Sequence, residues 1–399
     1  MACAGKAPRA ERPSLELADV FRDVGDRLEG ISSEQRKAAS AITRCRTAAL
    51  GGHVDACVDC GHREISYNSC RNRHCPKCQG LSQARWVEAR QQDLLPVEYF
   101  HVVFTVPDDL NPLFLANPRV AIDLFFSAVA ETVQEVALTP GRLGARVGLT
   151  AVLHTWTQKL LYHPHLHCIV PGGGLDPSGR RWISCRPGFF LPVRILSKVF
   201  RGKLLSRLED ALTRGKLETP PGADAKQLLR KASCHDWVVY SKAPFAGPEQ
   251  VIRYLGQYTH RIALSNHRLV SMENGHVTFR WKDRADGDRK KLLTLDAVQF
   301  LRRFLLHVLP RGLVRIRHYG LLANSVRKQR LEICRKLLDA SAPAPKSDPK
   351  PEPWQNLMLR LTGKDVTICP ACHKGHMVRK ELLPPAIAKW SSPGRGASP

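Results

Sequence analysis

The apolar positions of the chain change their period several times, and each change predicts a different element. Apolar residues that recur every three to four positions indicate helices, and runs of β-branched and aromatic residues indicate strands. The pattern predicts helices within 15–50 (two short ones) and over 81–95, 118–137, 296–309 and 325–338, and strands over 99–106, 147–156, 163–170 and 237–241. The strands at 147–156 and 163–170 are close enough in sequence to form a hairpin. Asn274-Gly275, between two alternating runs, predicts a second hairpin.

The net charge of the chain indicates what kind of molecule it binds. Lysine and arginine total 61 against 36 acidic residues, a formal net charge of +25 that is spread along the chain. This excess predicts a polyanionic partner, and at this length nucleic acid fits better than a membrane surface. No run of 18 apolar residues occurs, and the first residues lack the apolar core of a signal peptide. We therefore expect a protein inside the cell that does not bind membranes.

The 13 cysteines suggest metal ligands, because disulfides are rare in a reducing compartment. Cys57 and Cys60 form one Cys-x-x-Cys pair and Cys75 and Cys78 another, with 14 residues between the pairs. This spacing predicts one four-thiolate zinc ribbon, with free core thiols as the alternative. The same stretch holds further candidates, either to replace one of these four cysteines as a ligand or to bind a second ion: His53, His62, Cys70 and His74. A four-thiolate site has no open position, so we expect zinc here to be structural and not catalytic.

Two other features of the cysteine-rich regions stay open at this stage. Arg71 and Arg73 beside the zinc ribbon predict a DNA contact surface. The alternative is that the zinc module only stabilises the fold. In the tail, Cys369 and Cys372 supply half a metal site, which His373 and His376 are candidates to complete.

A second group of residues points to phosphate chemistry. His165 and His167 are two apart on a predicted strand, so both side chains point to one face. They are therefore placed to coordinate one cation. Tyr254 and Tyr258 are four apart on a further predicted helix, which begins at Gly247-Pro248, and they also share a face. Arg253 and Arg261 flank them and are suited to hold phosphate. Both pairs have a simpler interpretation as satisfied core histidines and core aromatic residues.

Several segments in the same order resemble one protein family. HPHLHCIV, YLGQYTHRIALSNHRL, FRWKD and SCRNRHCPKCQ are similar to segments of the rolling-circle transposases of the insertion-sequence-91 family, members of the HUH endonuclease superfamily. The resemblance covers roughly residues 30–335. It implies an α+β fold, in which an HUH nuclease domain has a central antiparallel sheet flanked by helices. A small zinc-ribbon-like domain precedes that nuclease domain.

The resemblance also implies a reaction. His165 and His167 would hold Mg²⁺ or Mn²⁺ against a phosphate of single-stranded DNA while Tyr258, or else Tyr254, attacks phosphorus. We expect a 5′-phosphotyrosine, a free 3′-hydroxyl and no need for ATP, in a bacterial cytoplasm and associated with the nucleoid. The third metal ligand stays open. Gln257 is the first candidate, and the others are His260, His163 and His154.

These expectations divide the chain into five parts. They are a helical and zinc-binding domain (1–95), a tyrosine nuclease domain (96–285), a basic helical extension (286–340), a Pro-rich linker (341–356) and a small tail (357–399). Two other functions fit the same residues. One is a plasmid replication initiator or relaxase of the same chemistry, and the other is a zinc-ribbon DNA-binding protein without enzymatic activity. A transposase with three carboxylates fits less well, because no acidic triad is apparent.

Overall fold

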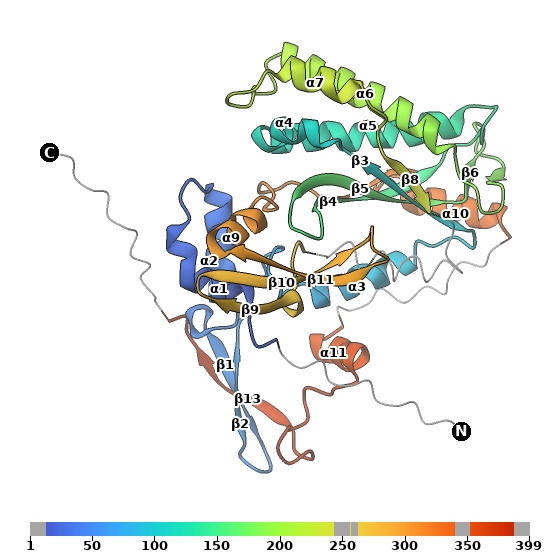
Figure 1. Cartoon of the computed structure of the whole chain (residues 1–399). Coiled ribbons are helices and arrows are strands. Elements are labelled where there is room, and N and C mark those ends of the chain that lie inside the picture. Colours follow the sequence, from blue (N-terminus) through green and yellow to red (C-terminus); the bar gives the residue numbers. More distant parts are fainter. Residues whose placement is uncertain (1–12, 243–255, 257–261, 340–351, 387–399) are drawn as a thin grey trace. The chain divides into compact units, whose positions relative to one another are not determined.

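The computed structural model describes residues 13–242, Gly256, 262–339 and 352–386. The chain divides into two compact units, each assembled from segments far apart in the sequence (Figure 1). The first unit combines Met1–Cys78, Leu264–Leu305 and Gly363–Pro399, and the second combines Gln79–Ala263 and Leu306–Thr362. The domain boundaries expected at 95, 285 and 357 do not coincide with these units. Residues 264–285 and most of the tail join the N-terminal segment.

The second unit is built on a five-stranded sheet with the order β12-β4-β5-β3-β8. Each pair of neighbouring strands is antiparallel. The strands are β3 (Tyr99–Thr105), β4 (Gly148–Trp156), β5 (Tyr162–Pro171), β8 (Val239–Lys242) and β12 (Ile316–Gly320). The central antiparallel sheet and the β4–β5 hairpin expected from the sequence are thereby confirmed. The strand β12 was not predicted, because its five half-buried residues do not alternate between apolar and polar.

The helices of this unit agree with the pattern in part. They are α3 (Gly80–Gln91), α4 (Asn111–Ala116), α5 (Pro118–Leu138), α6 (Val193–Thr213), α7 (Ala225–Ser233), α10 (Arg327–Leu337) and α11 (Trp354–Thr362). A short hairpin of β6 (Gly173–Leu175) and β7 (Trp182–Ser184) follows β5. The helix α6 was not predicted, although its buried residues Leu196, Phe200, Leu204 and Leu208 recur every four positions.

One face of the sheet forms the main hydrophobic core. Alternate side chains of β3, among them Phe100, Val102 and Phe104, are buried there together with the corresponding residues of β4 and β5. The long helices α5 and α6 cover this face (Figure 1), and the ring of Phe200 on α6 meets that of Phe104 edge to face at 5.3 Å. Because side chains alternate along a strand, the residues between these core positions point to the opposite face.

Among the described residues, the first unit has three α-helices and two small antiparallel sheets. Its helices are α1 (Leu17–Val24), α2 (Ser33–Arg44) and α9 (Ala297–Leu305), and its strands are β1 (Gly52–Cys57), β2 (Arg63–Tyr67), β9 (Leu269–Glu273), β10 (His276–Asp283), β11 (Arg289–Asp296) and β13 (Met377–Leu383). Phe21 on α1 packs edge to face against Phe304 on α9. The sheets have the orders β11-β10-β9 and β13-β1-β2. Residues from 363 onward thus complete a sheet that begins at residue 52.

In the part of the chain that the structure describes, no helix has both the length and the apolar character needed to cross a membrane.

His307 is buried behind the loop that joins β4 to β5. Its Nε2 donates a hydrogen bond to the carbonyl oxygen of Leu160 at 3.2 Å, and its Nδ1 lies 3.3 Å from the hydroxyl of Thr155. The ring of Tyr162 stacks parallel to it at 6.3 Å. Burial lowers the pKa of His307 from 6.5 to about 4. The unfolded chain therefore binds one more proton than the folded chain between these two pH values, and stability falls as the pH drops from 6.5 toward 4.

The substitution His307→Gln should make the protein less sensitive to acid. A glutamine amide can donate to Leu160 and accept from Thr155 but does not titrate. As the pH falls from 6.5 to 4, the wild-type protein should lose up to about 3 kcal/mol more unfolding free energy than the variant. Urea unfolding at a series of pH values measures this difference. Parallel pH profiles for the two proteins would contradict the assignment.

Candidate functional site

Four histidines gather on the face of the five-stranded sheet opposite α5 and α6. Positions 165 and 167 on β5 alternate with the core residues Leu166 and Cys168, and His154 on β4 follows the core residue Leu153. His154 lies directly opposite His165 in the β4–β5 register. The histidine pair predicted from the sequence is therefore joined by a third histidine from the neighbouring strand.

Three of these imidazoles converge on a common point. One ring nitrogen from each of His154, His165 and His167 lies within 4.8 Å of the other two. The ring centres of His154 and His167 are 4.7 Å apart, and those of His165 and His167 are 4.9 Å apart. His154 and His167 are buried, with 3% and 6% of their surfaces exposed, and His165 is half-buried. Three converging nitrogen donors at a site that is partly accessible to solvent can coordinate a divalent cation.

Hydrogen bonds orient two of the three rings. The Nδ1 of His165 lies 2.8 Å from the carbonyl oxygen of His163. Because a carbonyl only accepts, Nδ1 of His165 carries the proton and its Nε2 keeps the lone pair that a metal needs. The Nδ1 of His167 lies 2.8 Å from Nε2 of His101 on β3, a contact that orients the His167 ring. Such second contacts fix the tautomer and the ring angle of a metal ligand.

His101 was not predicted to belong to this group. It lies 66 positions before His167 in the sequence, and only the pairing of β3 with β5 brings the two rings together, stacked at 5.0 Å. The alternation within YFHVVFTV already placed His101 on the face opposite the apolar side chains. That is the one sequence signal that pointed to it.

The predicted residues of the tyrosine segment lie outside the described residues: Arg253, Tyr254, Gln257, Tyr258, His260 and Arg261. Gly256, between the two tyrosines in sequence, is described as helical and buried. A Cβ atom built at Gly256 would lie 2.3 Å from Cγ2 of Val87 on α3. Val87 in turn packs with Trp86 against Tyr99 and Ile169, which lie on the same sheet face as the histidines. Gly256 therefore lies against the helix that packs on this face.

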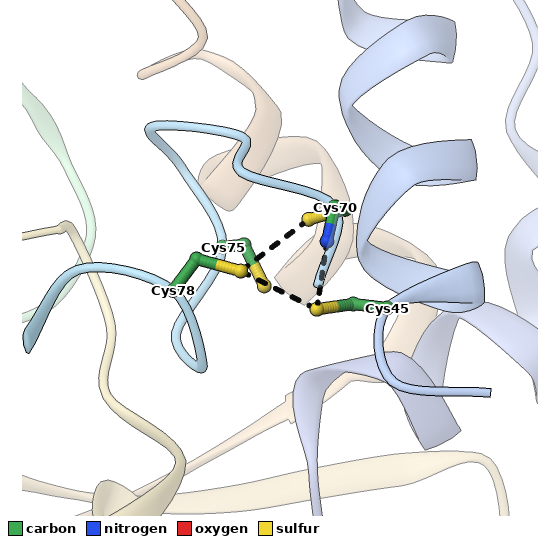
Figure 2. A group of neighbouring side chains, drawn as sticks. All are labelled: Cys45, Cys70, Cys75 and Cys78. Atoms are coloured by element: carbon green, nitrogen blue, oxygen red, sulfur yellow. Dashed lines mark hydrogen bonds between the residues drawn. The ribbon is translucent and has the colours of Figure 1, made fainter. Parts of the chain in front are cut away.

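Four cysteines of the first unit form one compact cluster (Figure 2): Cys45, Cys70, Cys75 and Cys78. Cys45 ends α2, and the other three belong to the segment that follows β2. The Sγ atom of Cys78 lies 3.4 Å from that of Cys45 and 3.7 Å from that of Cys70. Hydrogen bonds from Cys45, Cys70 and Cys75 hold the pKa of the Cys78 thiol well below its usual range.

The size of this cluster fits a tetrahedral metal ion. Sulfurs bound to zinc at about 2.3 Å in tetrahedral geometry lie about 3.8 Å from each other, whereas a disulfide brings two sulfurs to about 2.05 Å. All four sulfurs lie within 4.8 Å of one another. The backbone N–H of Cys70 also donates to Sγ of Cys45 at 3.4 Å, a contact that favours a thiolate. The donor set and its spacing thus fit zinc.

A second four-cysteine cluster joins residues far apart in the sequence: Cys57, Cys60, Cys369 and Cys372. Sγ of Cys57 lies 3.7 Å from Sγ of Cys372, and Sγ of Cys60 lies 3.7 Å from Sγ of Cys369. Backbone N–H groups, chiefly that of Gly375, lower the pKa of Cys372 to about 6.

The ligand grouping expected from the sequence changes accordingly. The pairs Cys57/Cys60 and Cys75/Cys78 were expected to share one ion, but the structure assigns them to different clusters. Each pair is completed by cysteines from elsewhere, so the candidate histidines His53, His62, His74, His373 and His376 belong to neither cluster. Cys45 carried no spacing signal, because it stands 12 residues before the first pair and has no cysteine partner nearby in sequence.

Two arginines beside the first cluster differ in exposure. Arg71 is exposed on a left-handed turn with φ of 53°, and Arg73 is half-buried. Burial lowers the pKa of the Arg73 guanidinium. Of these two expected DNA contacts, Arg71 is the more accessible to a phosphate.

Two family descriptions match separate parts of the chain. The family described as "Transposase zinc-binding domain" matches residues 17–106, which include all four cysteines of the first cluster. The family described as "Putative transposase" matches residues 148–330, which include the three convergent histidines. No solved structure matches the chain.

Two relatives agree with these matches. A Sinorhizobium fredii protein named "Putative transposase y4qJ" is 51% identical over 386 residues, which cover 93% of this chain and 96% of the relative. The transposase for insertion sequence element IS801 of Pseudomonas savastanoi pv. phaseolicola is 28% identical over 79% of this chain and 77% of its own length. The family resemblance seen in the sequence is confirmed. The chain belongs to the IS91 family of transposases.

Proposed function

We propose that this transposase nicks and rejoins single-stranded DNA at transposon ends through a 5′-phosphotyrosine intermediate, in rolling-circle transposition. The observation that carries the proposal is the convergence of His154, His165 and His167 on one face of an antiparallel sheet. Membership of a transposase family implies binding and cleavage of DNA. A cation held by these imidazoles supplies a means of cleavage that needs neither ATP nor a carboxylate triad.

The donor set decides which cation fits. Mg²⁺ prefers oxygen ligands, whereas imidazole nitrogens bind later first-row metals more strongly. Mn²⁺ therefore suits three histidines better than Mg²⁺ does. When bound, the cation polarises a phosphate oxygen and stabilises the charge that develops on it.

His154 takes the place of third ligand in this proposal. Gln257, the first candidate from the sequence, and His260 lie outside the described residues. His163 lies 3.2 Å from the carboxylate of Asp108, and it is not one of the three histidines whose ring nitrogens converge. His154 is buried beside His165 and His167, and the β4–β5 register holds it there.

The chain supplies the nucleophile from the segment around Gly256. We propose Tyr258 first and Tyr254 second. The phenol oxygen attacks phosphorus, a tyrosine O–P bond forms, and the bond from phosphorus to the 3′-oxygen breaks. The phenolic proton ends on the departing 3′-hydroxyl, so the linkage energy is kept for rejoining. A free tyrosine has a pKa of about 10, so Arg253 and Arg261 are proposed to hold the phosphate and favour the phenolate.

The first cysteine cluster is proposed to be the zinc site of the matched zinc-binding domain. Four thiolates saturate the ion, so its contribution is structural: it ties the end of α2 to the segment that carries Arg71 and Arg73. We propose that these arginines contact DNA phosphates, with Arg71 the more exposed.

The test is transfer of a label from DNA to the protein. The purified chain is incubated with labelled single-stranded DNA from the ends of its element, with Mn²⁺, Mg²⁺ or EDTA, and resolved on a denaturing gel. The label should move onto the protein with metal, at a lower concentration of Mn²⁺ than of Mg²⁺, and not with EDTA. Tyr258→Phe, or the double variant with Tyr254→Phe, should reduce labelling to the EDTA level.

A tyrosine outside the segment provides the control. Tyr240 on β8 is exposed, with 55% of its surface accessible, and has no role in the proposed chemistry. Tyr240→Phe should therefore label like the wild-type protein. If DNA binds but no labelled protein forms with any of the metals, the nuclease proposal fails.

His101 should act as a positioning residue for His167. If Nε2 of His167 binds the cation, its Nδ1–H donates to Nε2 of His101, and His101→Ala removes that acceptor. Loss of such a contact typically weakens metal binding by about 10–100-fold. Titration of the purified variant with Mn²⁺ by electron paramagnetic resonance measures this affinity, and saturating Mn²⁺ should restore most of the labelling.

The control for His101 is a half-buried histidine of the same sheet. His318 on β12 lies 2.9 Å from the hydroxyl of Thr150 and away from the three converging rings. His318→Ala should leave the Mn²⁺ affinity unchanged. Equal affinities for the His101→Ala variant and the wild type would show that His101 does not orient His167.

Gly256 should tolerate no side chain. A methyl group at Gly256 would overlap Val87, and overpacking costs about 1–3 kcal/mol, against a gain of up to about 1 kcal/mol for alanine over glycine in a helix. Gly256→Ala should therefore lower the Tm and DNA labelling, and adding Val87→Ala should recover both. Gly202→Ala on α6, where no atom lies within 4 Å of the new methyl group, should not lower the Tm. A Gly256→Ala protein as stable as the wild type would contradict this packing.

A further inference from the structure

We propose a second zinc site in the first unit, with two ligands from each of two distant segments: Cys57, Cys60, Cys369 and Cys372. Only the first two of these residues lie within the part of the chain that matches the zinc-binding family. The site does not depend on the nuclease proposal. Its role is to fasten residues 363–386 to the hairpin of β1 and β2.

The two halves of the cluster are local copies of one another. In each, the residue after the second cysteine has a left-handed backbone, with φ of 71° at Gly61 and 58° at His373. The N–H of that residue donates to the carbonyl of the first cysteine, at 3.2 Å in one half and 3.0 Å in the other. Two matching Cys-x-x-Cys turns that face each other form the paired knuckles of a four-thiolate zinc site.

Backbone amides point at the sulfurs in both halves. The N–H groups of Asp59 and Cys60 donate to Sγ of Cys57 at 3.4 and 3.5 Å. In the other half, the N–H groups of Ala371 and Gly375 donate to Sγ of Cys369 and Cys372, both at 3.4 Å. Donors converging on sulfur stabilise the thiolate, which is the form that binds metal.

The distances between the halves fit a metal and not a disulfide. The two cross-segment sulfur pairs are each 3.7 Å apart, close to the separation of about 3.8 Å for sulfurs on a tetrahedral zinc ion. A disulfide requires about 2.05 Å. Four thiolates favour zinc over hard cations such as Mg²⁺ and Ca²⁺, because hard cations prefer oxygen.

The surrounding backbone closes tightly on the cluster. The strand β13 pairs with β1 from Cys57↔Met377 to Gly52↔Leu383, and Figure 1 shows the two strands side by side. A Cβ atom at Gly375 would lie 2.5 Å from Sγ of Cys57 and 2.8 Å from Asp59, so only glycine fits. A metal that closes a loop of some 309 residues removes much conformational freedom from the unfolded chain.

The first test labels the cysteines of the full wild-type chain with an alkylating reagent and maps them by mass spectrometry. Cys60 and Cys234 are both exposed, so burial protects neither of them from the reagent. We expect Cys234 to react at once and the four cluster cysteines to stay protected until a chelator removes zinc, after which all four react. Rapid labelling of Cys60 or Cys372 in zinc-replete protein would overturn the proposal.

The second test counts metal ions in purified variants by elemental analysis. Replacing Cys369 and Cys372 with serine should remove one zinc ion per chain relative to the wild type, while Cys185→Ser/Cys234→Ser should remove none. Cys45→Ser/Cys70→Ser should remove a different ion and leave Cys60 protected from alkylation. Unchanged zinc content without Cys369 and Cys372, or iron in place of zinc, would overturn the assignment.

A third variant keeps all four sulfurs and therefore separates metal binding from loss of ligands. Gly375→Ala should release one zinc ion at a lower chelator concentration than the wild type, because its methyl group pushes against Cys57. If the serine variant does not fold, this release and the wild-type labelling still decide the question. Identical chelator profiles for Gly375→Ala and the wild type would count against the site.

Discussion

The register between β4 and β5 is the constraint on which the site depends. It sets His154 opposite His165 and places His167 two residues further along the same strand. Because side chains alternate, a slip of one residue would turn these imidazoles into the core of Phe and Leu side chains behind the sheet. That core holds the register: Leu153, Leu166 and Cys168 are each almost fully buried on the side of α5 and α6. Packing on one face thus positions the three histidines on the other.

Both four-cysteine clusters lie in the first unit, whose sheets are small. The first unit gathers segments separated by hundreds of residues, and its sheet β13-β1-β2 has three short strands with several exposed positions. So small a sheet buries little apolar surface, and metal ligation is a common way to stabilise such modules. The basic residues of this unit need not contribute to its core. The net charge of +25 on the whole chain fits a protein that binds DNA.

The sequence predicted the parts of the site that depend on local spacing. The hairpin, the face shared by His165 and His167, and the long helix at 118–137 followed from periods of two and 3.6 residues. The sequence did not predict which distant segments meet. His101 joins His167 through the pairing of β3 with β5, and Cys369 meets Cys60 across 309 positions. The grouping of Cys57/Cys60 with Cys75/Cys78 followed the sequence distance, whereas the fold groups the cysteines by strand pairing and by the end of α2. Such contacts come from tertiary packing, which a single sequence does not encode in its spacing.

We propose that three imidazoles of this sheet hold one divalent cation at the reaction centre. Anomalous diffraction at the manganese edge, from crystals of the protein soaked in Mn²⁺, locates such a cation. We expect one strong peak within coordination distance of the imidazole nitrogens of His154, His165 and His167. The peak should disappear in a His165→Ala crystal. A fully occupied manganese ion elsewhere, with no density between these rings, would contradict it.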